Sequence, residues 1–417
     1  MRFLWLAHAI PYPPKAGFLL RSYNLLRELA LEHTVDLIAF VQERWVTVLS
    51  NNLEEGLENA RNALGQFCRH VVFLPIDSLK PPPLGKRIAA LRALASGSSY
   101  TTSWLVSSSA RSAIARQIGI GGYDLAHFDT IGLAPYRGLA ASLPATLTHH
   151  NIESHMMRRR ANNVRNPVAS AYLRHEARLL EKFERTTAAS FARHITCSDL
   201  DRERLCALAP NARVVTIPNG VDCEYFSSSQ TPLRPASLVF VGTMDWYPNV
   251  DAMRFFLREV WPALRLRLPT ATLDIAGSNP PEALRRLAST HAGVTLHGYV
   301  PDIRPLIDSA ALYVCPIRDG GGTKLKLLDA FAMKKCVIAH PIACEGISVT
   351  PEKDVVLAES PAEFVERSLA LLADSARRKT IGEAARALVQ SQYSFRAIGA
   401  RFRSVLCDAA QTSSAAR

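Results

Sequence analysis

Short β-type runs alternate with helix-type patterns along almost the whole chain, and this alternation limits the possible folds more than any other feature. Strands separated by amphipathic helices are typical of βαβ units, in which the connecting helix leaves neighbouring strands parallel. We therefore expect parallel sheets with helices on their faces. The expected strands are 3–8, 35–40, 71–75, 125–128, 145–149, 194–197 and 214–217, followed by 238–242, 271–276, 294–297, 311–315 and 336–339.

The length indicates how these elements divide into domains. At about 100 to 200 residues per domain, 417 residues favour two large α/β domains. We expect a first domain over 1–214, a second over 215–385, and a C-terminal helix over 386–417 that packs back toward the first. The polar stretch 227–236 is expected near the interdomain linker, and the tail 411–417 is expected to fray.

Composition and charge narrow the class of protein. Hydrophobic residues make up 48% and charged residues 21%, which is typical of a folded globular chain. No segment approaches the roughly 18 consecutive apolar residues of a spanning helix, and the opening residues are expected to form a strand rather than a signal peptide. The eight cysteines form no Cys-x-x-Cys pair, so we expect reduced thiols in a cytosolic protein. The net charge of +12 favours an anionic partner such as nucleic acid, lipid headgroups or a nucleotide diphosphate.

Residues 315–333 are the most informative segment, because an apolar strand ends at Cys315 and a glycine-rich loop leads into a helix. Glycines let the backbone approach a ligand, and the free N–H groups of the helix face the loop, so the segment predicts an anion site. The candidate residues are Gly320, Gly321, Gly322, Thr323 (which is expected to open the helix), Lys324 and Lys326. Asp329, on the same helix, could accept hydrogen bonds from sugar hydroxyls. The alternative is a flexible turn with solvated lysines, since neither a P-loop nor a Rossmann glycine motif is present.

A second candidate site follows the expected strand 145–149. Polar side chains that come directly after a strand lie at the carboxyl edge of the sheet, where open α/β folds bind ligands. The candidates there are His150, Asn151 and Glu153, and Glu153 is expected either to order the loop or to meet an acceptor. The alternative is that His149 and Asn151 merely cap the next helix.

The loop after the first strand supplies two weaker candidates. Gly17 is expected to approach donor phosphates, and Arg21 to meet an anionic acceptor. The alternative for Arg21 is an exposed charge on a helix.

The order of motifs along the chain resembles the family-4 glycosyltransferases. The segments that carry the resemblance are the glycine-rich loop, Ile217 to Asp222, Phe240 to Gly242, Leu296 to Val300, Cys336 to Ala339, Glu345 to Gly346 and Tyr393 to Phe395. The opening Ala9 to Pro14 and the stretch Asp245 to Asp251 are similar to the sugar transferases associated with PEP-CTERM and exopolysaccharide systems. The resemblance implies an α/β fold of the GT-B type, with two facing Rossmann-like domains and a deep cleft between them.

The resemblance also implies roles for particular residues. His150 would lie over the reacting sugar, and Tyr299 and Val300 would contact the donor. The family's Glu-x7-Glu motif maps its second acid onto Asp329 but its first onto Gly321, so the lost contact would have to come from elsewhere, for example Asp319.

Further departures concern basic and acidic positions of the family. Many members carry an Arg and a Lys that bind the diphosphate where Thr243 and Asn249 stand here, which makes Lys324 and Lys326 the better candidates. Phe18 also replaces a frequent acidic residue, which weakens the assignment of acceptor contacts.

The expected activity is a retaining, hexosyl-type transfer from a nucleotide sugar to a hydroxyl of a glycan or a lipid-linked precursor, with no metal required. The alternatives are a GT-B sugar-nucleotide epimerase and a non-catalytic GT-B protein that binds a glycan or a partner. Two basic segments suggest a peripheral contact with the inner membrane face: 80–94, and 158–165 with Arg158, Arg159, Arg160 and Arg165. The equal alternative is that both are solvated helix surfaces. No nucleic-acid-binding motif accompanies the charge, so nucleic acid is not an expected partner.

Overall fold

The computed structural model describes residues 1–79, 85–164, 166–228, 231–320 and 323–414. The chain divides into two units, Met1–Pro218 together with Ile398–Arg417, and Asn219–Ala397, and each is described by itself. The predicted boundaries shift accordingly. The predicted boundary after residue 385 falls inside a helix of the second unit. The division between the units lies at Pro218 and Asn219, so the described residues of the stretch 227–236, which was expected near the linker, lie within the second unit.

The first unit is built on a sheet of seven parallel strands in the order β3-β2-β1-β4-β5-β6-β7. In β1, residues Phe3 to Ala7 are all buried, as expected for a parallel strand covered on both faces. The register pairs Phe3 with Val35 on one side and with Leu125 on the other. The strands are β1 (Arg2–Ala7), β2 (Thr34–Phe40), β3 (His70–Leu74), β4 (Leu125–Phe128), β5 (Ala145–His149), β6 (Arg193–Thr196) and β7 (Val214–Thr216).

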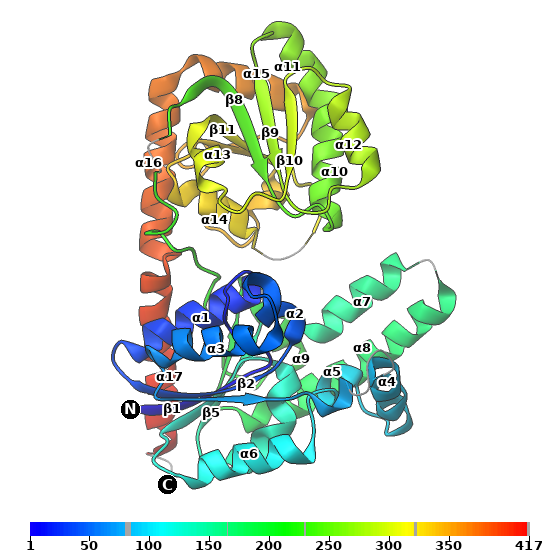
Figure 1. Ribbon diagram of the computed structural model, residues 1–417, viewed down its shortest axis with the longest axis vertical. Coiled ribbons are helices and arrows are strands. Elements are labelled where there is room, and N and C mark those ends of the chain that lie inside the picture. Colours follow the sequence, from blue (N-terminus) through cyan, green and yellow to red (C-terminus); the bar gives the residue numbers. More distant parts are fainter. Residues whose placement is uncertain (80–84, 165, 229–230, 321–322, 415–417) are drawn as a thin grey trace. The chain divides into compact units, whose positions relative to one another are not determined.

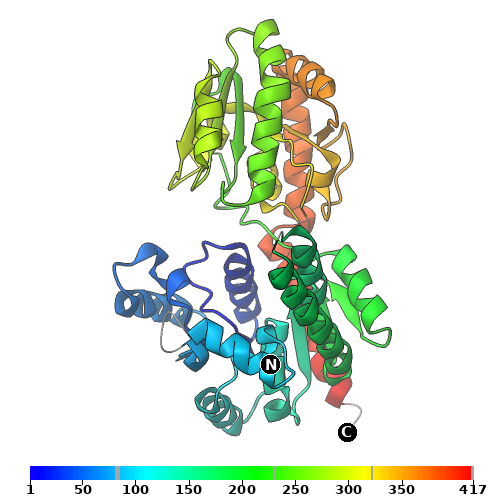
Figure 2. The same ribbon diagram turned by 90° about the vertical axis from the view of Figure 1, so that its right-hand side faces the viewer.

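Helices cover this sheet, and the last of them comes from the C-terminal end of the chain (Figures 1 and 2). In that helix, α17, the ring of Phe402 packs against Trp5 at 5.6 Å and His127 at 5.4 Å. The helices of the unit are α1 (Gly17–Ala30), α2 (Glu43–Val46), η1 (Thr47–Leu49), α3 (Leu53–Gly65), η2 (Asp77–Leu79), α4 (Gly85–Ala95), α5 (Tyr100–Ser103), α6 (Ser108–Gly119), η3 (Ile131–Ala140), α7 (Glu153–Asn163), α8 (Pro167–Thr187), η4 (Ala188–Ser190), α9 (Asp199–Leu208) and α17 (Phe395–Ser414).

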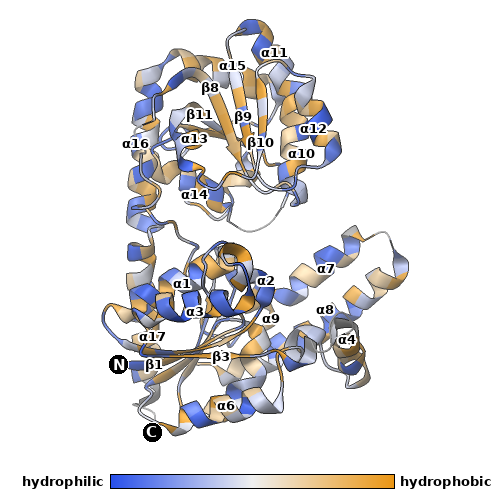
Figure 3. Cartoon of the chain, in the orientation of Figure 1, coloured by the Kyte–Doolittle hydropathy of each residue, from blue (hydrophilic) through white to orange (hydrophobic). Residues whose placement is uncertain are grey.

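The second unit contains six parallel strands in the order β10-β9-β8-β11-β12-β13. The strands of this sheet are mainly hydrophobic, whereas the helices around it carry both hydrophilic and hydrophobic residues (Figure 3). The strands are β8 (Arg234–Val241), β9 (Thr272–Ala276), β10 (Val294–Gly298), β11 (Ala310–Cys315), β12 (Val337–Ala339) and β13 (Val356–Leu357). The helices are α10 (Tyr247–Phe255), η5 (Phe256–Val260, a π-helical segment), α11 (Trp261–Arg267), α12 (Glu282–Ser289), α13 (Arg304–Ser309), α14 (Leu325–Ala332), η6 (Pro341–Cys344), α15 (Pro361–Ala373) and α16 (Ser375–Gln392).

All the expected strands are confirmed, with ends that differ by at most four residues, and among the strands in the described ranges only β13 was not predicted. All eight cysteines are free thiols. Within the described ranges, no helix combines the length and apolar composition needed to cross a bilayer. The basic segment 80–94 becomes α4 only from Gly85 onward, and residues 80–84 lie outside the description, as does Arg165.

Candidate functional site

Both sheets reverse their strand order at one point, where the chain leaves the carboxyl ends of two neighbouring strands in opposite directions. The reversal lies between β8 and β11 in the second unit, and between β1 and β4 in the first. Ligands of open α/β sheets bind at such points. The residues that follow these strands are therefore candidates for ligand contacts.

Two glycines shape the edge of the second sheet. A Cβ at Gly277 would overlap the carbonyl oxygen of Gly242, so the backbone after β9 packs directly on the backbone after β8. A Cβ at Gly242 would lie 2.5 Å from the Nζ of Lys326 and 2.8 Å from the Nδ2 of Asn249. The absence of side chains at these two positions leaves room for the ammonium of Lys326 above the end of β8.

Lys326 reaches this point from the first turn of α14. Its Nζ donates to the Oδ1 of Asn249 and lies 4.9 Å from the ring centre of Phe240 and 5.5 Å from that of Trp246. Burial lowers the pKa of Lys326 to about 8. No carboxylate in the described part of the chain forms an ion pair with it. A partly buried cation that lacks an anionic partner is well suited to bind a phosphate.

Asp329 lies one turn further along α14. Burial raises its pKa to about 7, although the positive charge of Lys326 opposes this rise. Its position on the same helix is consistent with the predicted acceptance of hydrogen bonds from a sugar, and this role stays a prediction.

The described start of the glycine-rich loop, at Gly320, has a tight conformation that neighbouring side chains support. Gly320 has a φ of 103°, and a Cβ there would lie 3.0 Å from Pro248. The Nζ of Lys324, which is only 3% exposed, donates to the carbonyl of Gly320 at 2.7 Å. The exposed Asp319 accepts the N–H of Gly320 at 2.6 Å. Lys324 therefore supports the loop, and its predicted contact with phosphate is untested, as is the donor-sugar role of Asp319.

The other residues of the second unit predicted to contact the donor are Thr323, Gly321, Gly322, Tyr299 and Val300. The helix begins at Leu325 with Lys324 as its N-cap, so the prediction that Thr323 opens it is wrong by two residues. The hydroxyl of Thr323 is buried without a partner and faces Gly346. Gly321 and Gly322 lie outside the described residues. Tyr299, which is 67% exposed, and Val300 follow the edge strand β10, and no described contact joins them to the glycine-rich loop.

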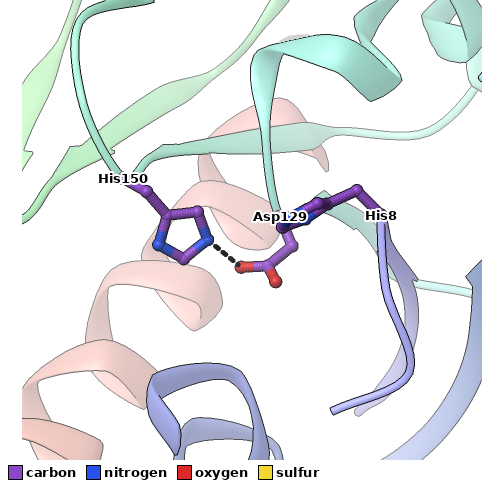
Figure 4. A group of neighbouring side chains, drawn as sticks. All are labelled: His8, Asp129 and His150. Atoms are coloured by element: carbon purple, nitrogen blue, oxygen red, sulfur yellow. Dashed lines mark ion pairs between the residues drawn. The ribbon is translucent and has the colours of Figure 1, made fainter. Parts of the chain in front are cut away.

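In the first unit, three side chains from three strand ends meet at the reversal of strand order (Figure 4). His8 follows β1, Asp129 follows β4 and His150 follows β5. The Nε2 of His150 lies 3.4 Å from the Oδ1 of Asp129, and the rings of His8 and His150 are 5.9 Å apart. The hydroxyl of Ser22, on α1, donates to the other oxygen of Asp129.

The charges in this cluster are set by the pairing. Burial opposes a charge on His150, but the carboxylate of Asp129, together with a hydrogen bond to Cys197, outweighs burial and raises the pKa of His150 to about 10. Burial also opposes the charge on Asp129, yet the neighbouring His150 holds the pKa of that carboxyl below its usual value. Burial, followed by the charge of His150, lowers the pKa of His8 to about 4. The site therefore presents a cationic imidazolium beside a neutral one.

The same three residues have the types and spacing that a metal ion requires. Their ligating atoms all lie within 4.8 Å of one another. That no metal is required stays a prediction.

The neighbours of His150 differ from expectation. Ile152 is the N-cap of α7, so the alternative in which His149 or Asn151 caps the helix is wrong. His149 instead contacts His194, with Nε2 and Nδ1 3.0 Å apart. Burial, together with the nearby Glu184, raises the pKa of Glu153 to about 7. Asn151 is exposed, and its acceptor role remains a prediction, like that of Glu153.

Arg21 is neither an exposed charge nor an available acceptor contact. It is 1% exposed, and its guanidinium donates to the carbonyl oxygens of Pro218 at 2.6 Å and Ile217 at 2.8 Å. Arg21 therefore anchors α1 to the end of the first unit, which contradicts an acceptor role. Gly17 is the exposed first residue of α1, and its donor role stays a prediction.

Sequence reasoning missed Asp129, His8 and Asn249. Asp129 follows the expected strand 125–128, and His8 is the last residue of the expected strand 3–8, so the rule that sheet edges bind ligands could have singled them out. Asn249 was noted only as a departure from the family, and no local pattern shows that Lys326 meets it.

Two family descriptions match most of the chain. Residues 21–225 match Glycosyltransferase Family 4, and residues 235–374 match Glycosyl transferases group 1. The chain belongs to the family-4-type glycosyltransferases. Its fold is accordingly the two-domain α/β GT-B fold, as the resemblance implied, and HepE of Anabaena in complex with UDP shares it. That structure is 13% identical, with a TM-score of 0.63 over 98% of this chain and 100% of HepE.

Two relatives match the chain over less than half of its length. It is 23% identical over 175 residues to an uncharacterized 44.6 kDa protein in the cps region of Klebsiella pneumoniae, covering 40% of this chain and 45% of that protein. It is 28% identical over 209 residues to a GDP-mannose-dependent monoacylated α-(1-6)-phosphatidylinositol monomannoside mannosyltransferase of Corynebacterium glutamicum, covering 46% and 55%. The chain thus spans about half the length of each relative.

Proposed function

We propose that the protein transfers a sugar from a nucleotide-sugar donor to a hydroxyl group, with retention of anomeric configuration. The observation that carries this proposal is the ammonium of Lys326, held by Asn249 at the reversal of strand order and lacking an anionic partner among the described residues. A departing nucleoside diphosphate develops negative charge, and a positioned cation stabilises that charge in the transition state. No metal is needed in this scheme.

The donor diphosphate is assigned to the second unit. The first N–H groups of α14 and the side chain of Lys326 lie at the same edge of the sheet, so both contribute positive potential to one anion. HepE, which shares the fold, is known in complexes with UDP and with UDP-glucose. A uridine nucleotide carrying a hexose is therefore the first donor to test.

The first unit is assigned to the sugar. The imidazolium of His150 can donate a charge-assisted hydrogen bond to a donor-sugar hydroxyl while Asp129 keeps it protonated and oriented. Glu153, whose pKa is raised to about 7, is available near the same strand end as a hydrogen-bonding group for the acceptor. These roles depend on side-chain chemistry, since the fold alone does not define a reaction.

The proposed acceptor is a glycan or a lipid-linked glycan precursor in exopolysaccharide biosynthesis, reached from the cytoplasmic face of a membrane. The similarity to the cps-region protein and to an enzyme named for a phosphatidylinositol mannoside supports this choice. A peripheral contact with the membrane is part of the proposal, because a lipid-linked acceptor remains in the bilayer.

Calorimetric titration of the full chain with UDP, GDP, ADP and CDP, with and without magnesium, tests the donor assignment. We expect saturable binding of one nucleotide, and a 10- to 100-fold weaker affinity in Lys326→Ala, because a charged hydrogen bond contributes about 1.5 to 3 kcal/mol. Lys353→Ala, at an exposed lysine of the second unit, is the matched control. Equal affinities in Lys326→Ala and wild type would remove the assignment.

Product analysis then separates the reactions. Transfer requires an acceptor, an epimerase releases a changed sugar nucleotide without one, and a non-catalytic protein binds without turnover. The non-catalytic alternative is tested because Gly321 stands where the family's Glu-x7-Glu motif has its first glutamate.

A further inference from the structure

Helices α7 and α8 form a hairpin in the first unit, and the two helices lie along each other in both views (Figures 1 and 2). On α8, the side that faces the protein contains Glu176, Ala177, Leu180 and Glu184, all of which are buried. Asn166 caps the helix by accepting the N–H groups of Val168 and Ala169, so the helix is well defined from its first turn.

The opposite side of α8 is a basic stripe, which we define as Arg174, Arg178, Lys182 and Arg185. An α-helix turns once every 3.6 residues, so this spacing places all four side chains on one side. All four residues are exposed. A stripe of this kind is a surface property of the folded helix and was not singled out from the sequence.

The acids of α8 do not neutralise the stripe. Glu176 is buried and accepts hydrogen bonds from Ser99 at 2.6 Å and from the backbone N–H of Thr101 at 3.0 Å. Glu184 is buried and accepts from the N–H of Ser154 at 3.3 Å. Glu181 is shared between Arg185, at 3.1 Å, and Arg158 of α7. Since Arg158 adds a further cation, the exposed side of the hairpin keeps a net positive charge.

A pocket of about 560 Å³ adjoins the stripe along the last turns of α8. Lys182 belongs to both the stripe and the pocket, and Arg111 supplies a second cation from α6. Leu179 and Phe183 line the same pocket with apolar surface, and Ser99 and Ser103 add hydroxyl groups. Cations and hydroxyls next to apolar surface match a phospholipid, in which a charged headgroup is joined to an acyl chain.

We propose that the basic stripe of α8 binds the surface of an anionic lipid bilayer, with a phospholipid headgroup in the adjoining pocket. Cations close to an anionic membrane each strengthen binding by about fivefold. The net charge of +12 on the chain acts in the same direction, and the stripe concentrates cations on one helix face beside the pocket. The inference rests on the proposed membrane contact and names the surface that makes it.

Vesicle flotation of the full chain tests this surface without any sugar transfer, so it can fail independently of the donor assignment. We expect flotation with vesicles of phosphatidylcholine mixed with phosphatidylglycerol, and none with phosphatidylcholine alone. Raising the salt from about 0.1 M to 1 M shortens the Debye length from about 10 to 3 Å and should release the protein.

The variant that replaces all four stripe cations by Gln should bind these vesicles at least about fiftyfold more weakly. The matched control removes the same charge from four exposed cations outside the hairpin, Arg116, Arg258, Arg286 and Lys379, and should stay within about twofold of wild type. Equal losses in the two variants would show that only net charge matters and would overturn the proposal. Tighter binding of an RNA homopolymer than of vesicles at the same salt would also overturn it.

Unchanged thermal unfolding and nucleotide affinity show that the variants remain folded. If the fourfold variant does not fold, the single variants Arg174→Gln and Arg178→Gln take its place, each with an expected loss of about fivefold. Both residues are exposed and form no ion pair among the described contacts, so neither change should disturb packing.

Discussion

The two sheets reverse their strand order in the same way, yet the side chains gathered at the two reversals differ in charge. In the second unit, Lys326 lies next to an amide and aromatic rings, without a carboxylate partner in the described part of the chain. In the first unit, the imidazolium of His150 is already paired with Asp129. One edge therefore has positive charge available for an anion, whereas at the other edge the charge of the imidazolium is paired with a carboxylate.

This difference shows how one topology supports two kinds of recognition. The parallel sheet fixes where strand ends meet, and the residue that follows each strand decides what can bind there. The glycine at the end of β8 makes space for a long cationic side chain, whereas His8 and Asp129 follow the corresponding strands β1 and β4 of the first unit.

The largest expected effect separates turnover from donor binding. His150→Ala should lower the rate of sugar transfer by about 100- to 1000-fold, because one hydrogen-bond donor to the reacting group is lost. Nucleotide affinity should stay within twofold of wild type, since we assign the nucleotide to the other edge. Rate assays and calorimetry on the same preparation check both, with the exposed His70→Ala as control. A parallel loss of nucleotide affinity would break the distinction between the two edges.

A smaller effect is expected from Gly242→Ala. The new methyl group would fall 2.5 Å from the Nζ of Lys326 and push the ammonium aside without removing its charge. We expect nucleotide affinity to fall roughly 10- to 30-fold, close to the loss of a charged hydrogen bond. Gly138→Ala adds a methyl group in open space and should change nothing. Full affinity in Gly242→Ala would show that the position of the ammonium is unimportant.

The pH dependence of donor binding sharpens the comparison further. Because the pKa of Lys326 is about 8, its charge is largely lost by pH 9, and nucleotide affinity should fall about tenfold between pH 7 and pH 9. Lys326→Arg keeps its charge over this range and should give a flat profile. Nucleotide affinity measured for both proteins from pH 7 to pH 9 tests this prediction. The same dependence of affinity on pH in both proteins would exclude Lys326 as the titrating group.

The smallest effect concerns stability of the first unit. The pKa of His150 is raised to about 10 from an ordinary value near 6.5, so the folded state holds an extra proton between these pH values. The resulting stabilisation is complete below pH 6.5 and is lost as pH rises toward 10. Asp129→Asn should remove this dependence, which amounts to about 1 kcal/mol between pH 8 and 9. Urea denaturation at both pH values measures it, and parallel behaviour of the two proteins would contradict the ion pair.

Strands such as β1 and β11 were predictable because each is a continuous apolar run that a parallel sheet buries on both faces. β13 was not, since its two residues give no pattern. The glycine-rich loop was also readable, because glycines and lysines next to a strand end are a local signal.

Non-local contacts account for what the sequence could not show. Arg21 looks like a surface charge on its helix until the carbonyls of Ile217 and Pro218 arrive from the far end of the unit. The meeting of Lys326 with Asn249 likewise depends on how β8 and α14 come together. Only three-dimensional neighbours distinguish a binding cation from a structural one.

The return of α17 to the first unit has a consequence for synthesis on the ribosome. Phe402 covers Trp5 and His127, and Arg403 donates to the carbonyl of Glu28 at 2.8 Å, so the last helix completes a core begun by the first strand. Roughly 180 residues of the second unit are made in between, which takes about 10 to 40 s at 5 to 20 residues per second. During this interval the nascent first unit exposes Trp5 and its neighbours, and it is then that a chaperone would find its binding surface.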